Sequence, residues 1–192
     1  MAIVYLIPLF FLTALVYSSV GFAGGSTYLA LLLLFQFPYT AIPKVALVCN
    51  LIVGAGALYH YIRGRHLSFG RVIPFVAASV PCAYLGGSLP IGKELFMALA
   101  AVSLAAAGLR LLFIEKITEP VTPAGPFTVW SVGLGAGAVF GFLGGLVGIG
   151  GGIFLAPLLY LLKWGTPRQI AAMASFFIFA NSLSGLAGQF HK

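Results

Sequence analysis

The 192-residue sequence contains no aspartate and only three acidic residues in total. Charged residues make up 7% of the chain and hydrophobic residues 61%. A soluble domain cannot hide so large an apolar fraction, because its surface needs more polar side chains than this chain has. The scarcity of charge therefore excludes a water-soluble fold and predicts an all-α, polytopic membrane protein.

The three acids, Glu94, Glu115 and Glu119, lie in or beside predicted loops. A carrier for cations or protons usually keeps a carboxylate at membrane depth, because a charge there is costly and is retained for function. The absence of such a carboxylate from the apolar segments disfavours Na⁺ or proton binding. It favours an anionic substrate.

Cysteine is also rare, and both Cys49 and Cys82 fall within apolar segments, where small packing residues are expected. No spacing of Cys, His and acidic residues matches a metal site, so we expect no metal and no other cofactor. The segments also lack a Ser/His or paired-carboxylate arrangement. An intramembrane enzyme is therefore the weakest interpretation.

The sparse charges divide the apolar sequence into six segments, at 2–36, 44–62, 72–91, 95–114, 127–162 and 169–190. About 20 helical residues cross a bilayer, so the first and fifth segments are too long for one ordinary span. The basic cluster of Arg63, Arg65 and Arg71 predicts a cytoplasmic loop. The formal charge of +7 is spread over short loops, which disfavours a nucleic-acid partner.

The two long segments begin matching halves of an internal duplication. "GFAGGSTYLALLLLFQF" at 21–37 aligns with "GIGGGIFLAPLLYLLKW" at 148–164, and "NLIVGAGALY" at 50–59 aligns with "NSLSGLAGQF" at 181–190. The pattern predicts a first transmembrane repeat at 1–114, a connecting loop at 115–126 and a truncated second repeat at 127–192.

Glycine is concentrated at the middle of both long segments. Helix packing needs a small residue only at every fourth position, whereas Gly150, Gly151 and Gly152 are consecutive. Each glycine lowers helix propensity by about 1 kcal/mol, so we predict a break. Residues 153–163 would then rise about 16 Å, which is half a bilayer. Pro157 is expected in the first turn of this half-helix, where its missing N–H is harmless.

A broken helix offers free N–H groups and a partial positive charge, and glycines let an anion approach the backbone. Paired discontinuous helices in two repeats indicate the binding site of a transporter. The candidate substrate-binding residues are therefore the glycines of both breaks and nearby neutral polar residues: Gly24, Gly25, Ser26, Thr27, Asn50, Gly150, Gly151, Gly152, Ser175, Asn181 and Ser184.

Two alternatives remain open at this stage. Asn50 and Asn181 match across the copies, and each either lines the site or makes an interhelical hydrogen bond. The long segments either cross the membrane, which makes the repeats parallel, or return to the side they entered, which makes the repeats inverted. The basic residues do not decide between these topologies.

The motifs "GGLVGIGGGIFLAPLLYLL" and "GTPRQIAAMASFFIFANSLSGLAG", with "GFAGGSTYLALLLL" in the first copy, resemble the TauE/SafE family of membrane transporters. The resemblance implies an eight-helix duplication that moves sulfite, sulfoacetate or related organosulfur anions across the bacterial inner membrane. Two features depart from it. Ala23 stands at the position of Gly150, and the last helix pair is absent, as in a shortened member or a fragment.

We therefore expect a secondary transporter of the cell membrane that moves a small anion. The resemblance implies that this anion is sulfite or an organosulfonate such as sulfoacetate. The expected partners are the anion, the lipid bilayer and further copies of the chain. The alternatives are a channel-like anion pore and a non-transporting membrane subunit.

Overall fold

The computed structural model describes residues 2–112 and 125–191, and every regular element within these ranges is an α-helix. The helices are α1 (Ala2–Val20), α2 (Gly25–Leu34), α3 (Ile42–Arg63), α4 (Phe69–Ser88), α5 (Lys93–Leu112), α6 (Pro126–Val147), α7 (Gly152–Leu161) and α8 (Pro167–Phe190). Within the described ranges, α3, α4, α6 and α8 are long and apolar enough to cross a membrane. The predicted all-α membrane fold is confirmed.

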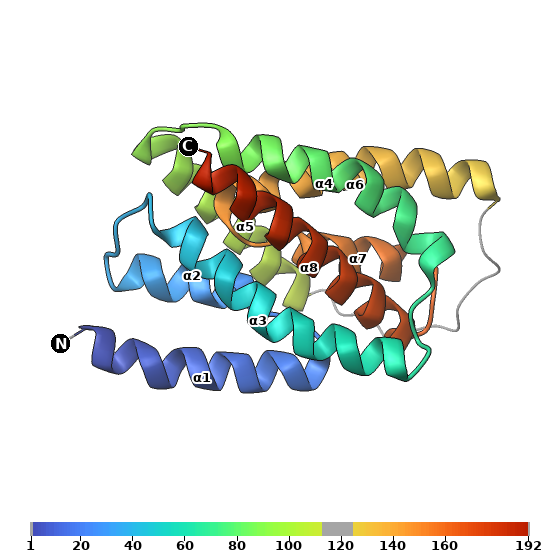
Figure 1. Cartoon of the computed structure of the whole chain (residues 1–192), viewed down its shortest axis with the longest axis horizontal. Coiled ribbons are helices and arrows are strands. Elements are labelled where there is room, and N and C mark those ends of the chain that lie inside the picture. Colours follow the sequence, from blue (N-terminus) through green and yellow to red (C-terminus); the bar gives the residue numbers. More distant parts are fainter. Residues whose placement is uncertain (1, 113–124, 192) are drawn as a thin grey trace.

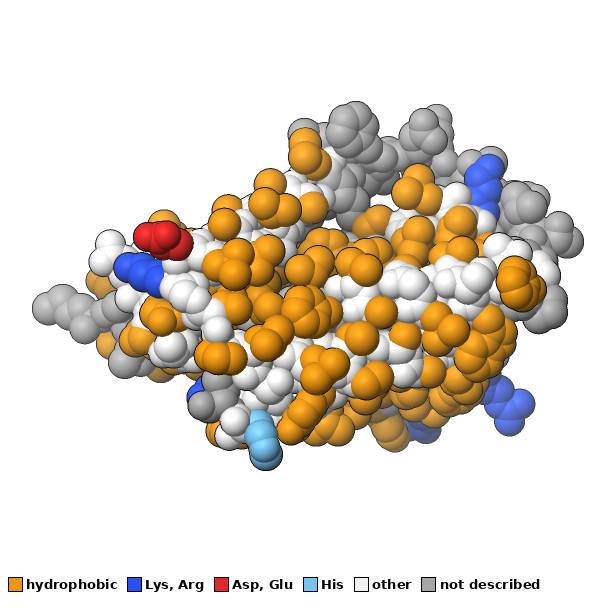
Figure 2. Space-filling model, turned by 90° about the horizontal axis from the view of Figure 1, so that it is seen from above, with side chains coloured by type: hydrophobic (Ala, Val, Ile, Leu, Met, Phe, Trp, Pro, Cys, Tyr) orange, Lys and Arg blue, Asp and Glu red, His pale blue; other side chains and the backbone are white. Residues whose placement is uncertain are grey.

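Large hydrophobic side chains cover the outside of the bundle. Val4, Leu34, Phe127 and Leu161 are each at least 70% exposed. Figure 2 shows hydrophobic side chains over most of one face, with Lys, Arg and Glu side chains towards the two ends of the long axis. This distribution suits a protein whose middle is surrounded by hydrocarbon and whose ends reach the headgroups.

Both long apolar segments are broken in the middle, as predicted. The first break, residues 21–24, separates α1 from α2, and the second break, residues 148–151, separates α6 from α7. α2 and α7 have 10 residues each, so each rises about 15 Å, half the thickness of the hydrocarbon core. The breaks therefore place non-helical backbone deep within the bundle.

The prediction for Pro157 is wrong in position. α7 begins at Gly152, directly after the left-handed residue Gly151, and Pro157 is its sixth residue. Proline there lies beyond the first turn, so it removes the hydrogen bond that an N–H would donate to the carbonyl of Ile153. The start of α7 is set by Gly151, and not by the proline.

The two broken segments enter the bundle from opposite ends (Figure 1). α1 runs inward from the left end and α2 returns to it, whereas α6 runs inward from the right end and α7 returns to the right. α3 and α8, which follow the two hairpins, consequently run in opposite directions along each other. Each long segment is therefore a helical hairpin that begins and ends at the same end of the bundle, and the two hairpins point in opposite directions, as the inverted arrangement of the repeats predicts.

α4 packs closely along α6, the helix that leads to the second break. Gly133, Gly137, Gly141 and Gly145 recur at every fourth residue of α6, and a Cβ on any of them would collide with α4. Such a small-residue stripe lets two helix backbones approach closely in a membrane. α4 also packs along α8, so α4, α6 and α8 form the most tightly associated part of the fold.

Candidate functional site

The two breaks share a backbone conformation that favours glycine. Gly21 and Gly148 are equivalent in the duplication and have φ angles of 83° and 90°. Gly24 and Gly151 are also equivalent, with φ angles of 84° and 74°. Left-handed backbone is unfavourable for residues that carry a Cβ, because the Cβ crowds the following carbonyl oxygen. The sequence duplication therefore extends to the local geometry of the breaks.

The breaks differ at one position. Gly150 has a φ angle of 74°, whereas Ala23, its equivalent, is not among the residues with positive φ. This difference accounts for the alanine that departs from the glycine pattern, since Ala23 needs no left-handed backbone. The second break thus contains one more left-handed residue than the first.

Asn50 of α3 lies where the two breaks meet. A Cβ added to Gly25, the first residue of α2, would lie 2.6 Å from Asn50 Nδ2 and 2.7 Å from the carbonyl oxygen of Ile149 in the second break. A Cβ added to Gly150 would lie 3.1 Å from Asn50 Nδ2 and 2.8 Å from Ser182 Oγ of α8. The structure therefore brings together the start of α2, the second break, α3 and α8.

Three buried polar side chains of α3 and α8 lack hydrogen-bond partners among the described residues. Asn50 and Ser182 lie at this junction, and Asn181 precedes Ser182 on α8. Asn50, Asn181 and Ser182 are each 0% exposed. Both amide atoms of Asn50, both amide atoms of Asn181 and the hydroxyl of Ser182 are unpaired. We call Asn50, Asn181 and Ser182 the polar cluster. Buried polar atoms are normally paired, so an unpaired cluster indicates a site for a ligand or water.

Backbone donors border the polar cluster. The first N–H groups of an α-helix have no carbonyl four residues before them, so the starts of α2 and α7 offer free donors and a partial positive charge. Gly25 and Gly152, the first residues of these helices, are buried. Neither helix has a side-chain cap at its N-terminus. The arrangement places neutral hydrogen-bond donors of the backbone beside those of the side chains.

Ser175, a predicted site residue, holds the first break in place. Its Oγ donates to the carbonyl of Gly21 and lies 2.9 Å from the carbonyl oxygen of Ala171 within α8. Ser175 is therefore a positioning residue that ties α8, from the second repeat, to the break in the first repeat.

The other predicted serines and threonine are placed differently. Ser184 Oγ donates to the carbonyl of Val80 in α4 at 2.6 Å, so this hydroxyl joins α8 to α4 and does not belong to the polar cluster. Thr27 Oγ1 lies 2.9 Å from the hydroxyl of Tyr17, which links α2 to α1. Ser26 is buried, with 8% of its surface exposed, in the first turn of α2.

Ser182 is a member of the cluster that the sequence pattern does not single out. The duplication aligns Asn50 with Asn181, so the residue after Asn181 aligns with the apolar Leu51. The repeat therefore gives no signal for a polar residue at this position. Only the approach of Ser182 to Gly150 reveals it.

Comparison with known proteins assigns the family. The chain matches the family model "Sulfite exporter TauE/SafE" over residues 6–192. The chain belongs to the TauE/SafE family. This TauE/SafE protein is similar to "Probable membrane transporter protein y4hK" of Sinorhizobium fredii, with 35% identity over 186 residues that cover 93% of this chain and 73% of the relative.

A second TauE/SafE comparison gives the same assignment. "Probable membrane transporter protein YunE" of Bacillus subtilis is 28% identical over 213 residues, which cover 96% of this chain and 77% of the relative. No solved structure matches the chain. The family and the relatives confirm the predictions of a membrane transporter and of a multi-pass membrane location.

Proposed function

We propose that this TauE/SafE chain is a secondary carrier for a small anion, sulfite or an organosulfonate such as sulfoacetate, and that the anion binds at the polar cluster. The observation that carries the proposal is the set of unpaired buried atoms on Asn50, Asn181 and Ser182. Their position between the two helical hairpins supports a transport site.

The energetics support a ligand at this position. Each buried polar atom left without a partner costs about 1–3 kcal/mol. Five such atoms occur in the cluster, so the fold would bear a cost of about 5–15 kcal/mol if nothing completed their hydrogen bonds. An anion with several oxygens accepts from the two amide NH2 groups and the hydroxyl, which are three of the five unpaired groups. The two amide oxygens are acceptors, so a water molecule or an O–H of the ligand would complete them.

The composition of the cluster supports a negative sign for the ligand. Its side chains are neutral, and the helix starts beside it offer N–H donors and positive dipole ends, which stabilise an anion. Glu94, the acid that the described ranges include, lies in the first turn of α5 and is exposed. The cluster therefore contains three donor groups for oxyanion oxygens and no carboxylate, and its two amide oxygens carry no formal charge.

Burial favours a carrier over an open pore. Asn50 and Asn181 are 0% exposed, so neither end of the bundle gives water direct access to them in this conformation. A conducting pore needs a continuous path, whereas a carrier passes through a state in which its site is closed from both sides. The structure resembles that closed state.

The test is uptake of radiolabelled sulfite and sulfoacetate into proteoliposomes that contain the full chain, with Rb⁺ as the cation control. We expect saturable uptake of at least one anion and none of Rb⁺. Asn181→Leu should abolish most of the anion uptake, because it removes two hydrogen-bonding atoms of the cluster. Leu183→Ala is the matched control, because Leu183 lies on the same helix and is 57% exposed.

Three results would contradict the proposal. Folded protein that moves neither anion would exclude these substrates. Uptake that survives Asn181→Leu would remove the cluster from the pathway. Flux that does not saturate and exceeds carrier turnover in bilayer recordings would assign a pore instead.

A further inference from the structure

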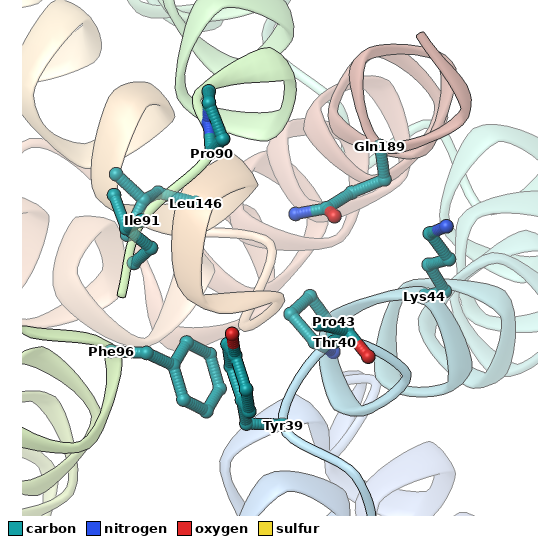
Figure 3. A pocket seen from close by; sticks show the side chains of 9 residues that line it. All are labelled: Tyr39, Thr40, Pro43, Lys44, Pro90, Ile91, Phe96, Leu146 and Gln189. Carbon is teal, nitrogen blue, oxygen red and sulfur yellow. The ribbon is translucent and has the colours of Figure 1, made fainter. Parts of the chain in front are cut away.

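A cavity lies at the end of the bundle where α3 begins (Figure 3). Its volume is about 270 Å³, and Tyr39, Thr40, Lys44 and Gln189 supply its polar lining. A water molecule occupies about 30 Å³ in the liquid, so the cavity is large enough for a small anion with part of its water shell. Figure 3 shows side chains from the loop before α3, from α3 and from the end of α8 around this space.

Lys44 gives this cavity a positive charge. The Lys44 Nζ atom lies 5.7 Å from the centre of the Phe190 ring, a distance that suits a cation–π contact. Lys44 is one of the residues that line the cavity, and its ammonium group lies over the ring of the exposed Phe190. Lys93 begins α5 at the same end of the chain's bundle but does not line the cavity, and it is exposed.

Neutral donors stand beside Lys44 in the cavity. Tyr39 and Thr40 carry hydroxyl groups, and Gln189 carries a carboxamide. Gln189 Nε2 donates to the carbonyl of Gly145 at 3.2 Å, which fixes the amide and leaves its second N–H hydrogen for another acceptor. A cation with several hydroxyl and amide donors is the chemistry that recognises a carboxylate, sulfonate or other oxyanion.

The cavity wall continues into the second break. Leu146 and Pro43 line the cavity, and a Cβ on Gly148 would lie 2.5 Å from Pro43 Cα. The carbonyl of Ile149, one residue later, faces Gly25 beside Asn50. Three residues of the chain, 147–149, thus separate Leu146 in the cavity wall from Gly150 beside the polar cluster.

We propose that this cavity is a vestibule in which Lys44 binds the anion before it reaches the polar cluster. The proposal rests on anion transport by the chain and adds a second, charged subsite. A cation at the water-exposed end attracts anions from solution, whereas a neutral cluster at membrane depth avoids holding them too tightly to release. The basic loop between α3 and α4 lies at the opposite end of α3, so the positive-inside rule places the vestibule outside the cytoplasm.

The direct test measures protection of lysine from acetic anhydride by sulfoacetate, with the full chain in detergent and labelling read by mass spectrometry. We expect sulfoacetate to slow acetylation of Lys44 and to leave Lys93 unchanged, while the neutral solute acetamide slows neither. Equal acetylation of Lys44 with and without sulfoacetate overturns the vestibule.

A kinetic test separates charge from structure. In right-side-out proteoliposomes, Lys44→Gln should raise KM about 10-fold and leave kcat within about twofold. Electrostatic attraction raises the rate at which the anion reaches the protein and has little effect on the translocation step at the central site. Lys44→Arg should restore most of the wild-type KM, and Lys93→Gln should match the wild type. An unchanged KM for Lys44→Gln, or an equal rise for Lys93→Gln, contradicts the proposal.

The two proposals fail separately. Protection of Lys44 in a chain whose uptake survives Asn181→Leu keeps the vestibule and removes the polar cluster as the transport site. Loss of uptake with Asn181→Leu, together with no protection of Lys44, keeps the central site and removes the vestibule.

Discussion

Replacing Asn50 with leucine should lower the rate of anion transport and leave the stability of the empty protein unchanged or higher. Leucine has the same branching at Cγ as asparagine, so it fits a similar volume between Gly25 and Gly150 while it removes both unpaired amide atoms. Each unpaired buried atom costs about 1–3 kcal/mol, so the empty protein should be as stable as the wild type or more stable. A hydrogen bond to a charged ligand contributes about 1.5–3 kcal/mol, which the variant loses.

The loss in transport follows from the same numbers. Since about 1.4 kcal/mol corresponds to a factor of ten, Asn50→Leu should lower kcat/KM for anion uptake by about 10- to 150-fold. The assay pairs initial uptake rates in proteoliposomes with the thermal unfolding midpoint in detergent, measured without substrate. The matched control is Ile52→Leu, because Ile52 is on the same helix and 71% exposed.

Two outcomes would refute this reasoning. If Asn50→Leu lowers the unfolding midpoint clearly, the amide acts as an interhelical hydrogen-bond group in the folded protein, and the unpaired atoms do not mark a ligand site. If uptake stays within about threefold of the wild type at an unchanged midpoint, Asn50 does not touch the anion.

Gly150→Ala should reduce uptake strongly and lower the free energy of unfolding by about 1–2 kcal/mol, because Gly150 has a φ angle of 74° and a Cβ would approach Ser182. The control Gly56→Ala should be neutral or stabilising, because nothing lies within 4 Å of the added Cβ; unfolding midpoints and uptake rates check both variants. Ser175→Ala should slow uptake, because it removes the hydrogen bond that holds Gly21 of the first break against α8. Ser184→Ala should lower the free energy of unfolding by about 0.5–1.5 kcal/mol and retain uptake; equal uptake in both variants contradicts these separate roles. A cysteine in the loop between α2 and α3 should react with an impermeant maleimide from outside intact cells, and one in the loop between α3 and α4 should not, in a background without native cysteines; the reverse pattern refutes the assigned orientation.

Much of the fold follows from patterns that lie close together in the sequence. The scarcity of charge predicts the membrane, and consecutive glycines at 150–152 predict a break, because each depends on local preference. The direction of the hairpins could not be predicted in this way. It depends on whether the chain turns back after Gly24 and Gly151, which the packing of α2 and α7 against the other helices decides.

The site was predicted in part for a similar reason. The duplication points to the glycine breaks and to Asn50, which the structure brings together. Ser184 lies elsewhere because the faces of α8 are assigned by its contacts with α4, and the spacing of polar residues does not reveal those contacts. Ser182 has no polar counterpart in the first repeat, so comparison of the two repeats does not identify it as a site residue. Contacts between distant segments decide these details.

The most direct measurement is the position of the anion itself. Crystals of the chain grown with 2-bromoethanesulfonate would locate the bromine by its anomalous scattering. The account predicts a peak beside Asn50 and Ser182, where the start of α2 meets the second break, and its loss in Asn50→Leu. A peak that is found only outside the polar cluster, in crystals of protein that transports this anion, would contradict the central claim.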